Sequence, residues 1–152
     1  KLGISMFLAE LLSYATRHEQ ANGVLYLFVQ NSIEWLDRAK GSIGNFHIVF
    51  RIQLSFHLGF MPNIESGMSG DYFDLVDGCF VAHVPSHVHY LNKEDSMRLV
   101  SLFRLEYKTM HLYTMSRIER NRCVEVILEY YKLHLPGFPE MKSFAVLQEL
   151  FA

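Results

Sequence analysis

Residues 45–59, NFHIVFRIQLSFHLG, decide the fold of this chain. Wound as a helix, this stretch would carry apolar side chains on nearly every face, so we expect it at the centre of the core. Asn45 is a suitable N-cap, because its side chain can accept hydrogen bonds from free backbone N–H groups. Gly59 would end the helix.

Helical periodicity continues on both sides of this central segment. Apolar residues spaced at i, i+3, i+4 and i+7 predict two helices before it, over residues 4–17 and 24–39. After it, a helix is expected over residues 94–105 and a short one over 106–112. Ser116-Arg117-Ile118-Glu119 has capping-box spacing and predicts the start of a long helix, stopped by Pro136 and Gly137. Its buried stripe would be Cys123, Val126, Ile127, Tyr130 and Leu133.

One short stretch predicts β structure. Asp77-Gly78 separates two apolar runs, residues 72–76 and 79–82, which is a strong hairpin signal because both turn residues tolerate positive φ. A last short helix is expected from Ser143 through Phe151. The fold class is therefore mostly α, a helical bundle with a small β-hairpin insertion.

Length and composition restrict the classes further. The chain has 152 residues, which predicts one domain. It begins with Lys1 rather than Met, so we expect a piece of a longer protein. No apolar stretch reaches ~20 residues, so no membrane-spanning helix is expected. The net charge of −2 excludes a surface that binds polyanions everywhere, and any nucleic-acid contact needs a local basic patch.

The sequence carries no catalytic signature. It lacks the nucleophile elbow, the phosphate-binding loop, the zinc-protease motif and the dinucleotide fingerprint, which predicts a protein that is not an enzyme. Cys79, His83, His87 and His89 have the side chains that zinc prefers. Their C-x3-H-x3-H-x-H spacing is not a standard zinc pattern, so we interpret them as strand and loop residues. No metal and no cofactor are expected.

A local excess of positive charge lies in residues 98–122, where six basic residues face only Glu106 and Glu119, a net +4. Aromatic residues are interleaved with them, which is the combination that binds single-stranded DNA through phosphate pairing and base stacking. The alternative is an ordinary solvated helix face with the aromatic rings turned inward. The candidate DNA-binding residues are Arg98, Arg104, Lys108, Arg117, Arg120 and Arg122.

Arg51 is the only formally charged residue in the central helix, and it forms a thin polar stripe with His47 and Ser55. An arginine at an apolar edge suits an acidic peptide with a hydrophobic end, because its guanidinium binds a carboxylate through two hydrogen bonds. The alternative is an internal salt bridge, with Glu34 or Asp37 as the partner.

Two long stretches resemble a known family. Residues 45–63, NFHIVFRIQLSFHLGFMPN, are similar to a helical segment of the RecO family of DNA repair proteins. The stretch from YFDLVDGCFVAHVPSHVHYL through FRLEYKTMHLYTMSRIERNRCVEVILEYYKLHLPGFPEMKSFAVLQELF resembles the C-terminal part of members from Bacteroides-like bacteria. The resemblance covers almost the whole chain and implies a C-terminal helical domain, residues 1–152, with the N-terminal OB-fold domain of the family apparently absent from this chain.

The resemblance also implies a function. RecO proteins are recombination mediators of the bacterial cytoplasm, associated with the nucleoid. They bind DNA, anneal complementary strands, act with RecR and RecF to load RecA, and bind the acidic C-terminal tail of single-stranded DNA-binding protein. The expected partners are therefore that tail, RecR and single-stranded DNA, the last more weakly without the OB fold. The alternative is a pure protein-interaction domain with no DNA contact of its own.

One departure from the family pattern concerns zinc. Many members carry a four-cysteine zinc site after the central helix, whereas residues 64–70 here read IESGMSG. We expect the Asp77-Gly78 hairpin to stand in place of the zinc module. The tail-binding groove of the family lies on the helical domain, which nominates Arg51, Leu54, Leu58 and Phe60 as candidate peptide-groove residues here.

Overall fold

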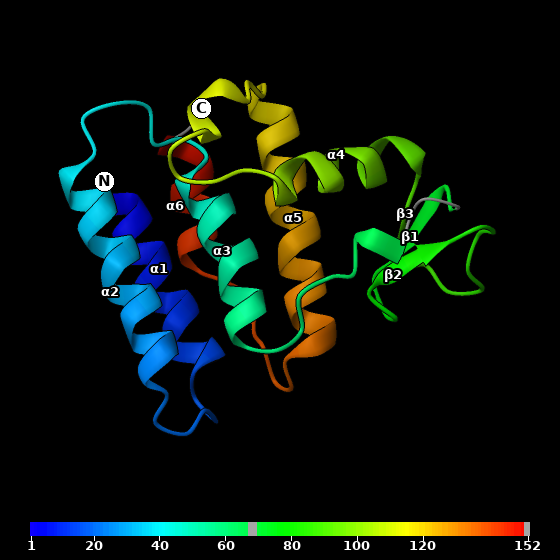
Figure 1. Ribbon diagram of the computed structural model, residues 1–152, viewed down its shortest axis with the longest axis horizontal. Helices are drawn as coiled ribbons and strands as arrows, with labels where there is room; N and C mark the ends of the chain where they lie inside the picture. The colour runs from blue at the N-terminus through cyan, green and yellow to red at the C-terminus, as the bar shows by residue number, and fades with distance from the viewer. Residues whose placement is uncertain (67–69, 151–152) are drawn as a thin grey trace.

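The central helix α3, Phe46–His57, lies among the other helices of the computed structural model, which describes residues 1–66 and 70–150 (Figure 1). Nine of its 12 residues are buried, which confirms the prediction of a helix in the middle of the core. It packs against α2, α4 and α5. Its apolar side chains therefore organise the main hydrophobic cluster, to which α1, α2, α5 and α6 also contribute.

The other helices lie close to their predicted bounds. α5 begins with the predicted capping box, in which Ser116 and Glu119 exchange side-chain and backbone hydrogen bonds. Leu133 is 36% exposed, so its predicted place in the buried stripe of α5 is wrong. Residues 106–112 form only the 3-10 helix η2, Met110–Leu112. The remaining helices are α1 Leu2–Ala15, α2 Gly23–Arg38, α4 Lys93–Phe103, α5 Arg117–His134 and α6 Ser143–Leu150, and Phe151 falls outside the described residues.

The predicted hairpin forms, and a third strand joins it. β1 Tyr72–Asp74 pairs with β2 Cys79–Val81 across a turn in which Gly78 has φ +67°. The Asp74 carboxylate accepts hydrogen bonds from the backbone N–H groups of Val76 and Asp77, which tightens the turn. The unpredicted strand β3, Tyr90–Leu91, pairs antiparallel with the other edge of β1, giving the order β2-β1-β3. No sequence pattern indicated β3, because two residues are too few to show a period.

A second, smaller hydrophobic cluster joins this sheet to α4 and α5. It consists of the buried residues Phe73, Leu75, Leu91, Leu99, Val126 and Tyr130. Polar contacts reinforce it, because the His134 ring lies 2.8 Å from the Leu75 carbonyl and the Tyr130 hydroxyl donates to the Phe60 carbonyl. The sheet is thus fixed to one side of the helical bundle (Figure 1). Within the described ranges, no helix combines the length and apolar character needed to cross a bilayer.

Glu10 ties α1 to α6 and supports a first prediction. Its carboxylate accepts hydrogen bonds from the backbone N–H groups of Lys142 (2.8 Å) and Ser143 (2.7 Å), at the start of α6. Partial burial alone would raise the pKa of Glu10, but the hydrogen bonds from Ser143 and Lys142 outweigh it and lower the pKa. We expect E10Q to lose about 1 kcal/mol of unfolding free energy at neutral pH, as for a lost helix cap.

The acid dependence of this effect has a definite sign. A carboxyl whose pKa is lower in the folded than in the unfolded chain stabilises the fold at pH values above its unfolded pKa, which is 4.5 here. That stabilisation is lost as the pH falls through the folded pKa. Urea unfolding at neutral pH and at pH values below 4.5 should show the gap between wild type and E10Q closing on acidification. E149Q, an exposed carboxyl change on α6 itself, is the control. A gap that persists unchanged in acid would contradict the assignment.

Candidate functional site

Two of the six cations predicted to bind DNA belong to an ion-pair network between α4 and α5. Arg98 lies within 3.1 Å of Asp95, 3.2 Å of Glu94 and 3.4 Å of Glu119, and Arg122 lies 3.0 Å from Asp95. Glu94 and Asp95 lie just before residues 98–122, so their negative charges are not included in the net +4 of that stretch. The excess at the surface is therefore smaller than the sequence indicates.

A third cation, Arg120, is half-buried and holds a loop in place. Its guanidinium donates to the side-chain oxygen of Asn45 at 3.3 Å and to the Met115 carbonyl at 3.4 Å. The Asn45 amide nitrogen in turn donates to the carbonyls of Met110 (3.0 Å) and Tyr113 (2.8 Å). Asn45 thus occupies the predicted N-cap position of α3, but its side chain makes no cap hydrogen bond. It instead fastens the segment 104–116 to the start of α3.

Arg104, Lys108 and Arg117 make up the rest of the predicted patch. All three side chains are exposed, and none forms an ion pair with the residues that the structure describes. Their charges are therefore free to meet a polyanion. DNA binding by the six residues stays a prediction, and these three are its strongest members.

Lys108 lies at a surface hollow of about 450 Å³ that the sequence did not indicate. Trp35 and Tyr107 form an aromatic wall, with ring centroids 5.1 Å apart and planes inclined by 28°. The Tyr107 hydroxyl donates to the Ser32 hydroxyl at 2.8 Å. Burial raises the pKa of Tyr107, so its hydroxyl stays protonated at neutral pH. We call this feature the Trp35–Tyr107 hollow, lined by Trp35, Ala39, Lys40, Gly41, Ser42, Tyr107, Lys108 and His111.

The hollow combines two exposed lysines with aromatic surface. Lys40 and Lys108 form no ion pair within residues 1–66 and 70–150, and His111 is exposed beside them. Trp35 and Lys40 were missed because they come from the end of α2 and the residues just after it, some 70 positions away from Tyr107 and Lys108. No local pattern links the two segments. The volume falls in the range of ~300–1,000 Å³ typical of ligand sites.

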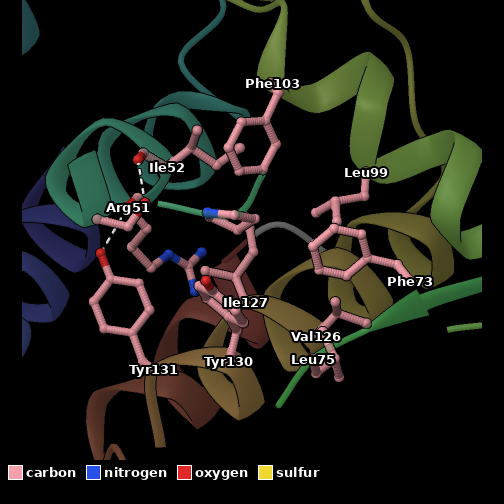
Figure 2. Close-up of a pocket in the computed structure, with 12 residues that line it drawn as sticks. Arg51, Ile52, Phe73, Leu75, Leu99, Phe103, Val126, Ile127, Tyr130 and Tyr131 are labelled. Atoms are coloured by element: carbon pink, nitrogen blue, oxygen red, sulfur yellow. Dashed lines mark hydrogen bonds between the residues drawn. The ribbon is translucent and has the colours of Figure 1, made fainter. Parts of the chain in front are cut away.

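Arg51, nominated for the peptide groove, is instead a core residue with no exposed surface. Its guanidinium donates to the His47 carbonyl at 2.9 Å, lies 2.6 Å from the His47 ring Nδ1, and stands 4.7 Å from the centroid of the Phe7 ring. The Tyr131 hydroxyl donates to the Arg51 carbonyl at 2.6 Å. Figure 2 shows the guanidinium enclosed beside Tyr131 and Ile127. The alternative salt bridge with Glu34 or Asp37 is not formed.

Because Arg51 is buried, it cannot line a peptide groove at the surface. Leu54 is also 0% exposed, so a peptide can reach neither residue in this conformation. Leu58 and Phe60 are half-buried and pack at the edge of the core. The void beside Arg51 measures about 10 Å³, room for roughly one water molecule. Of the four residues predicted to line a peptide groove, only Leu58 and Phe60 therefore reach the surface.

The charge of Arg51 has consequences for its neighbours. Burial lowers the pKa of Arg51 to about 9, so it is still a cation at neutral pH. Burial, and then the nearby charge of Arg51, hold the pKa of His47 well below its usual range, so that the His47 ring is neutral. No carboxylate among the described residues pairs with this guanidinium.

Two histidines of the sheet region, His87 and His89, lie within hydrogen-bonding distance of carboxylates. His87 Nε2 lies 3.1 Å from an Asp74 oxygen, and His89 Nδ1 lies 2.8 Å from a Glu129 oxygen on α5. In the part of the chain that the structure describes, no three His, Cys, Asp or Glu side chains gather as a metal would require. His89 thus connects the sheet region to α5, whereas the contact of His87 lies within the sheet region.

Comparison with known proteins gives one consistent result. The family model described as "Recombination protein O C terminal" matches residues 1–143. A DNA repair protein RecO of Phocaeicola vulgatus is 48% identical over 152 residues, covering 100% of this chain and 63% of the relative. The Bacteroides fragilis RecO is 47% identical, covering 99% and 63%, and that of Porphyromonas gingivalis is 35% identical, covering 97% and 61%.

The chain thus spans about 63% of the length of the relatives from P. vulgatus and B. fragilis. No solved structure gives a significant match. The family model and the relatives agree with the resemblance found in the sequence. This chain belongs to the RecO family of DNA repair proteins, matching the region that the family model describes as the C terminal of recombination protein O.

Proposed function

We propose that this chain is a non-enzymatic binding module of a recombination mediator, which holds the acidic C-terminal tail of single-stranded DNA-binding protein at the Trp35–Tyr107 hollow. One observation carries the proposal: a single hollow contains an aromatic wall and two lysines, Lys40 and Lys108, that form no ion pair with any described residue. Partnership with RecR in loading RecA belongs to the same proposal and rests on family membership.

The chemistry of the hollow suits such a peptide. The aspartates of an acidic tail would meet the ammonium groups of Lys40 and Lys108, and an apolar terminal side chain would cover the exposed ring surface of Trp35. Exposed ion pairs contribute only about 0–1 kcal/mol each, so most of the affinity comes from the apolar contact. The lysines supply selectivity for acidic sequences and make the complex sensitive to salt.

The test is fluorescence anisotropy of a labelled acidic peptide that ends in a free phenylalanine carboxylate. We expect saturable binding, and about tenfold weaker binding to the double variant K40A/K108A, from the loss of two exposed charge contacts. K142A, an exposed lysine change beside α6, should bind like wild type. The same peptide without its phenylalanine should bind far more weakly. Equal binding of both peptides, or no effect of the double variant, would contradict the proposed site.

A second candidate function, direct contact with single-stranded DNA, is favoured by the three unpaired cations Arg104, Lys108 and Arg117. If each cation neutralises a phosphate, a plot of the logarithm of the affinity against the logarithm of the salt concentration should have a negative slope of ~0.7 per contact. The double variant R104A/R117A should then flatten this slope by about 1.4. R17A, a cation at the far end of α1, is the control.

The DNA experiment separates the two candidate roles. Anisotropy of labelled single-stranded DNA, titrated at several salt concentrations, gives the slope for each variant. An unchanged slope in R104A/R117A would remove these residues from the DNA contact. A flat signal at low salt would favour the alternative of a pure protein-interaction domain.

A further inference from the structure

A second hollow adjoins the Trp35–Tyr107 hollow on the side of α2 that packs against α3. It measures about 460 Å³, and we call it the Phe28–His57 hollow. Its lining is Val24, Leu27, Phe28, Asn31, Ser32, Trp35, Gln53, His57 and Tyr107. Trp35 and Tyr107 line both hollows, so the two are continuous across this pair of rings. A ligand held in the first hollow therefore borders the second.

The two hollows differ in charge. Lys40 and Lys108 line the first, whereas the described lining of the second contains no Asp, Glu, Lys or Arg. The joined groove thus passes from a cationic end to an uncharged end. An acidic peptide with one apolar end matches that order, with its carboxylates at the lysines and its apolar end in the Phe28–His57 hollow. A wholly apolar partner would leave the lysines uncovered by any opposite charge.

The Phe28–His57 hollow offers more than apolar surface. Leu27 is 55% exposed, and the rings of Phe28 and His57 stack with centroids 4.4 Å apart. The side-chain amides of Asn31 and Gln53 make no hydrogen bond with any described residue. Each amide carries an NH₂ group that can donate to a carboxylate. Apolar surface beside two uncommitted donors suits a chain-terminal apolar residue, which carries a free carboxylate as well as a side chain.

We propose that the Phe28–His57 hollow receives the C-terminal residue of the acidic peptide, with its ring against Leu27 and Phe28 and its free carboxylate at the amides of Asn31 and Gln53. This inference rests on the proposed function and goes further, because it assigns the terminal residue a subsite of its own. Trp35 is a wall of both hollows, so a ring in the second hollow still covers Trp35.

One short peptide can reach both hollows. Asn31 lines the second hollow and Ala39 the first, and they lie eight positions apart along α2 and its C-cap. Eight positions correspond to about 12 Å along a helix. An extended peptide covers that distance with about four residues. The acidic residues can therefore lie at Lys40 and Lys108 while the terminal residue occupies the Phe28–His57 hollow.

Anisotropy with three N-terminally labelled peptides tests the subsite: the acidic peptide ending in a free phenylalanine carboxylate, the same peptide ending in a carboxamide, and the peptide without its phenylalanine. We expect amidation to weaken binding to wild type about tenfold, as for a lost charged hydrogen bond. L27D, which places a negative charge beside the ring and the carboxylate, should weaken binding of the free-acid peptide about tenfold or more.

A second variant and a control separate this subsite from a general loss of structure. N31A/Q53A should weaken binding of the free-acid peptide and bind the amidated peptide as wild type does. I33D places the same charge on α2 at a 49% exposed position outside both linings, and should bind all three peptides like wild type. L27D should leave the weak binding of the peptide without phenylalanine unchanged, because the group that it repels is missing.

The outcomes distinguish this inference from the proposed function. If K40A/K108A weakens binding but L27D behaves like I33D, the terminal residue lies outside the Phe28–His57 hollow and the proposed function stands. If K40A/K108A binds like wild type, both the proposed function and this inference are wrong. Equal binding of the free-acid and amidated peptides would overturn the carboxylate contact. An equal effect of L27D on the peptides with and without phenylalanine would overturn the ring contact.

Discussion

Replacing Asn45 with alanine should lower the free energy of unfolding by about 2–3 kcal/mol and weaken binding at the Trp35–Tyr107 hollow. The Asn45 side chain is 6% exposed and makes three hydrogen bonds, to Met110, Tyr113 and Arg120. Alanine would remove all three and leave buried carbonyl groups short of a donor. The cost of such unsatisfied groups exceeds the net contribution of an ordinary hydrogen bond.

The loss should be concentrated in the segment 104–116. This segment carries Tyr107 and Lys108. Among the described contacts its hydrogen bonds to the start of α3 come from Asn45, and the Tyr107 ring also stacks on Phe46 of α3. Hydrogen exchange should therefore accelerate there before it accelerates in α3 or α5. Urea unfolding gives the stability change, with N121A on α5 as the matched asparagine control. A change below about 0.5 kcal/mol, typical of neutral surface substitutions, would show that the amide does not hold the loop.

Replacing Arg51 with methionine should raise the free energy of unfolding by about 1–3 kcal/mol, comparable to the gain when a buried ion pair is replaced by apolar residues of similar volume. At neutral pH the guanidinium is charged, and within residues 1–66 and 70–150 no carboxylate pairs with it and its terminal nitrogen Nη1 has no hydrogen-bond partner. The remaining contacts, to His47 and the Phe7 ring, offset only part of the desolvation cost. Methionine fills most of the same volume without carrying charge.

The comparison with alanine separates charge from packing. R51A also removes the charge, but it leaves a cavity among the residues that surround Arg51 in Figure 2, so it should be less stable than R51M by about 2–5 kcal/mol. Thermal and urea unfolding of the three proteins provide the measurement. If R51M proves less stable than wild type, then the contacts with His47 and Phe7 outweigh the cost of burying the guanidinium.

Local patterns predicted the helical part of this fold well. The capping box at Ser116 and Glu119, the apolar α3 and the Asp77-Gly78 turn each depend on residues within a few positions of one another. Such patterns can be recognised in a single sequence because the interactions that cause them join residues close together in the chain. Strand β3 was missed because it is defined only by its partner β1.

The candidate site was harder to predict, because its geometry comes from contacts between distant segments. The polar stripe of His47, Arg51 and Ser55 exists, but periodicity gives the face of a helix and not what covers it. Here the stripe faces the core. The pairing of Arg98 and Arg122 with Asp95 likewise depends on how α4 packs on α5. Net charge along the chain could not show which cations remain free.

Trp35 is the single tryptophan of the chain, and it lies in the wall of the Trp35–Tyr107 hollow, where its ring clusters with those of Phe46 and Tyr107. The intrinsic fluorescence of the native protein therefore originates at one known place. Its emission wavelength and its quenching by iodide or acrylamide report on solvent access to that wall, with no dye attached. The chain thus carries a built-in optical probe of its own candidate site.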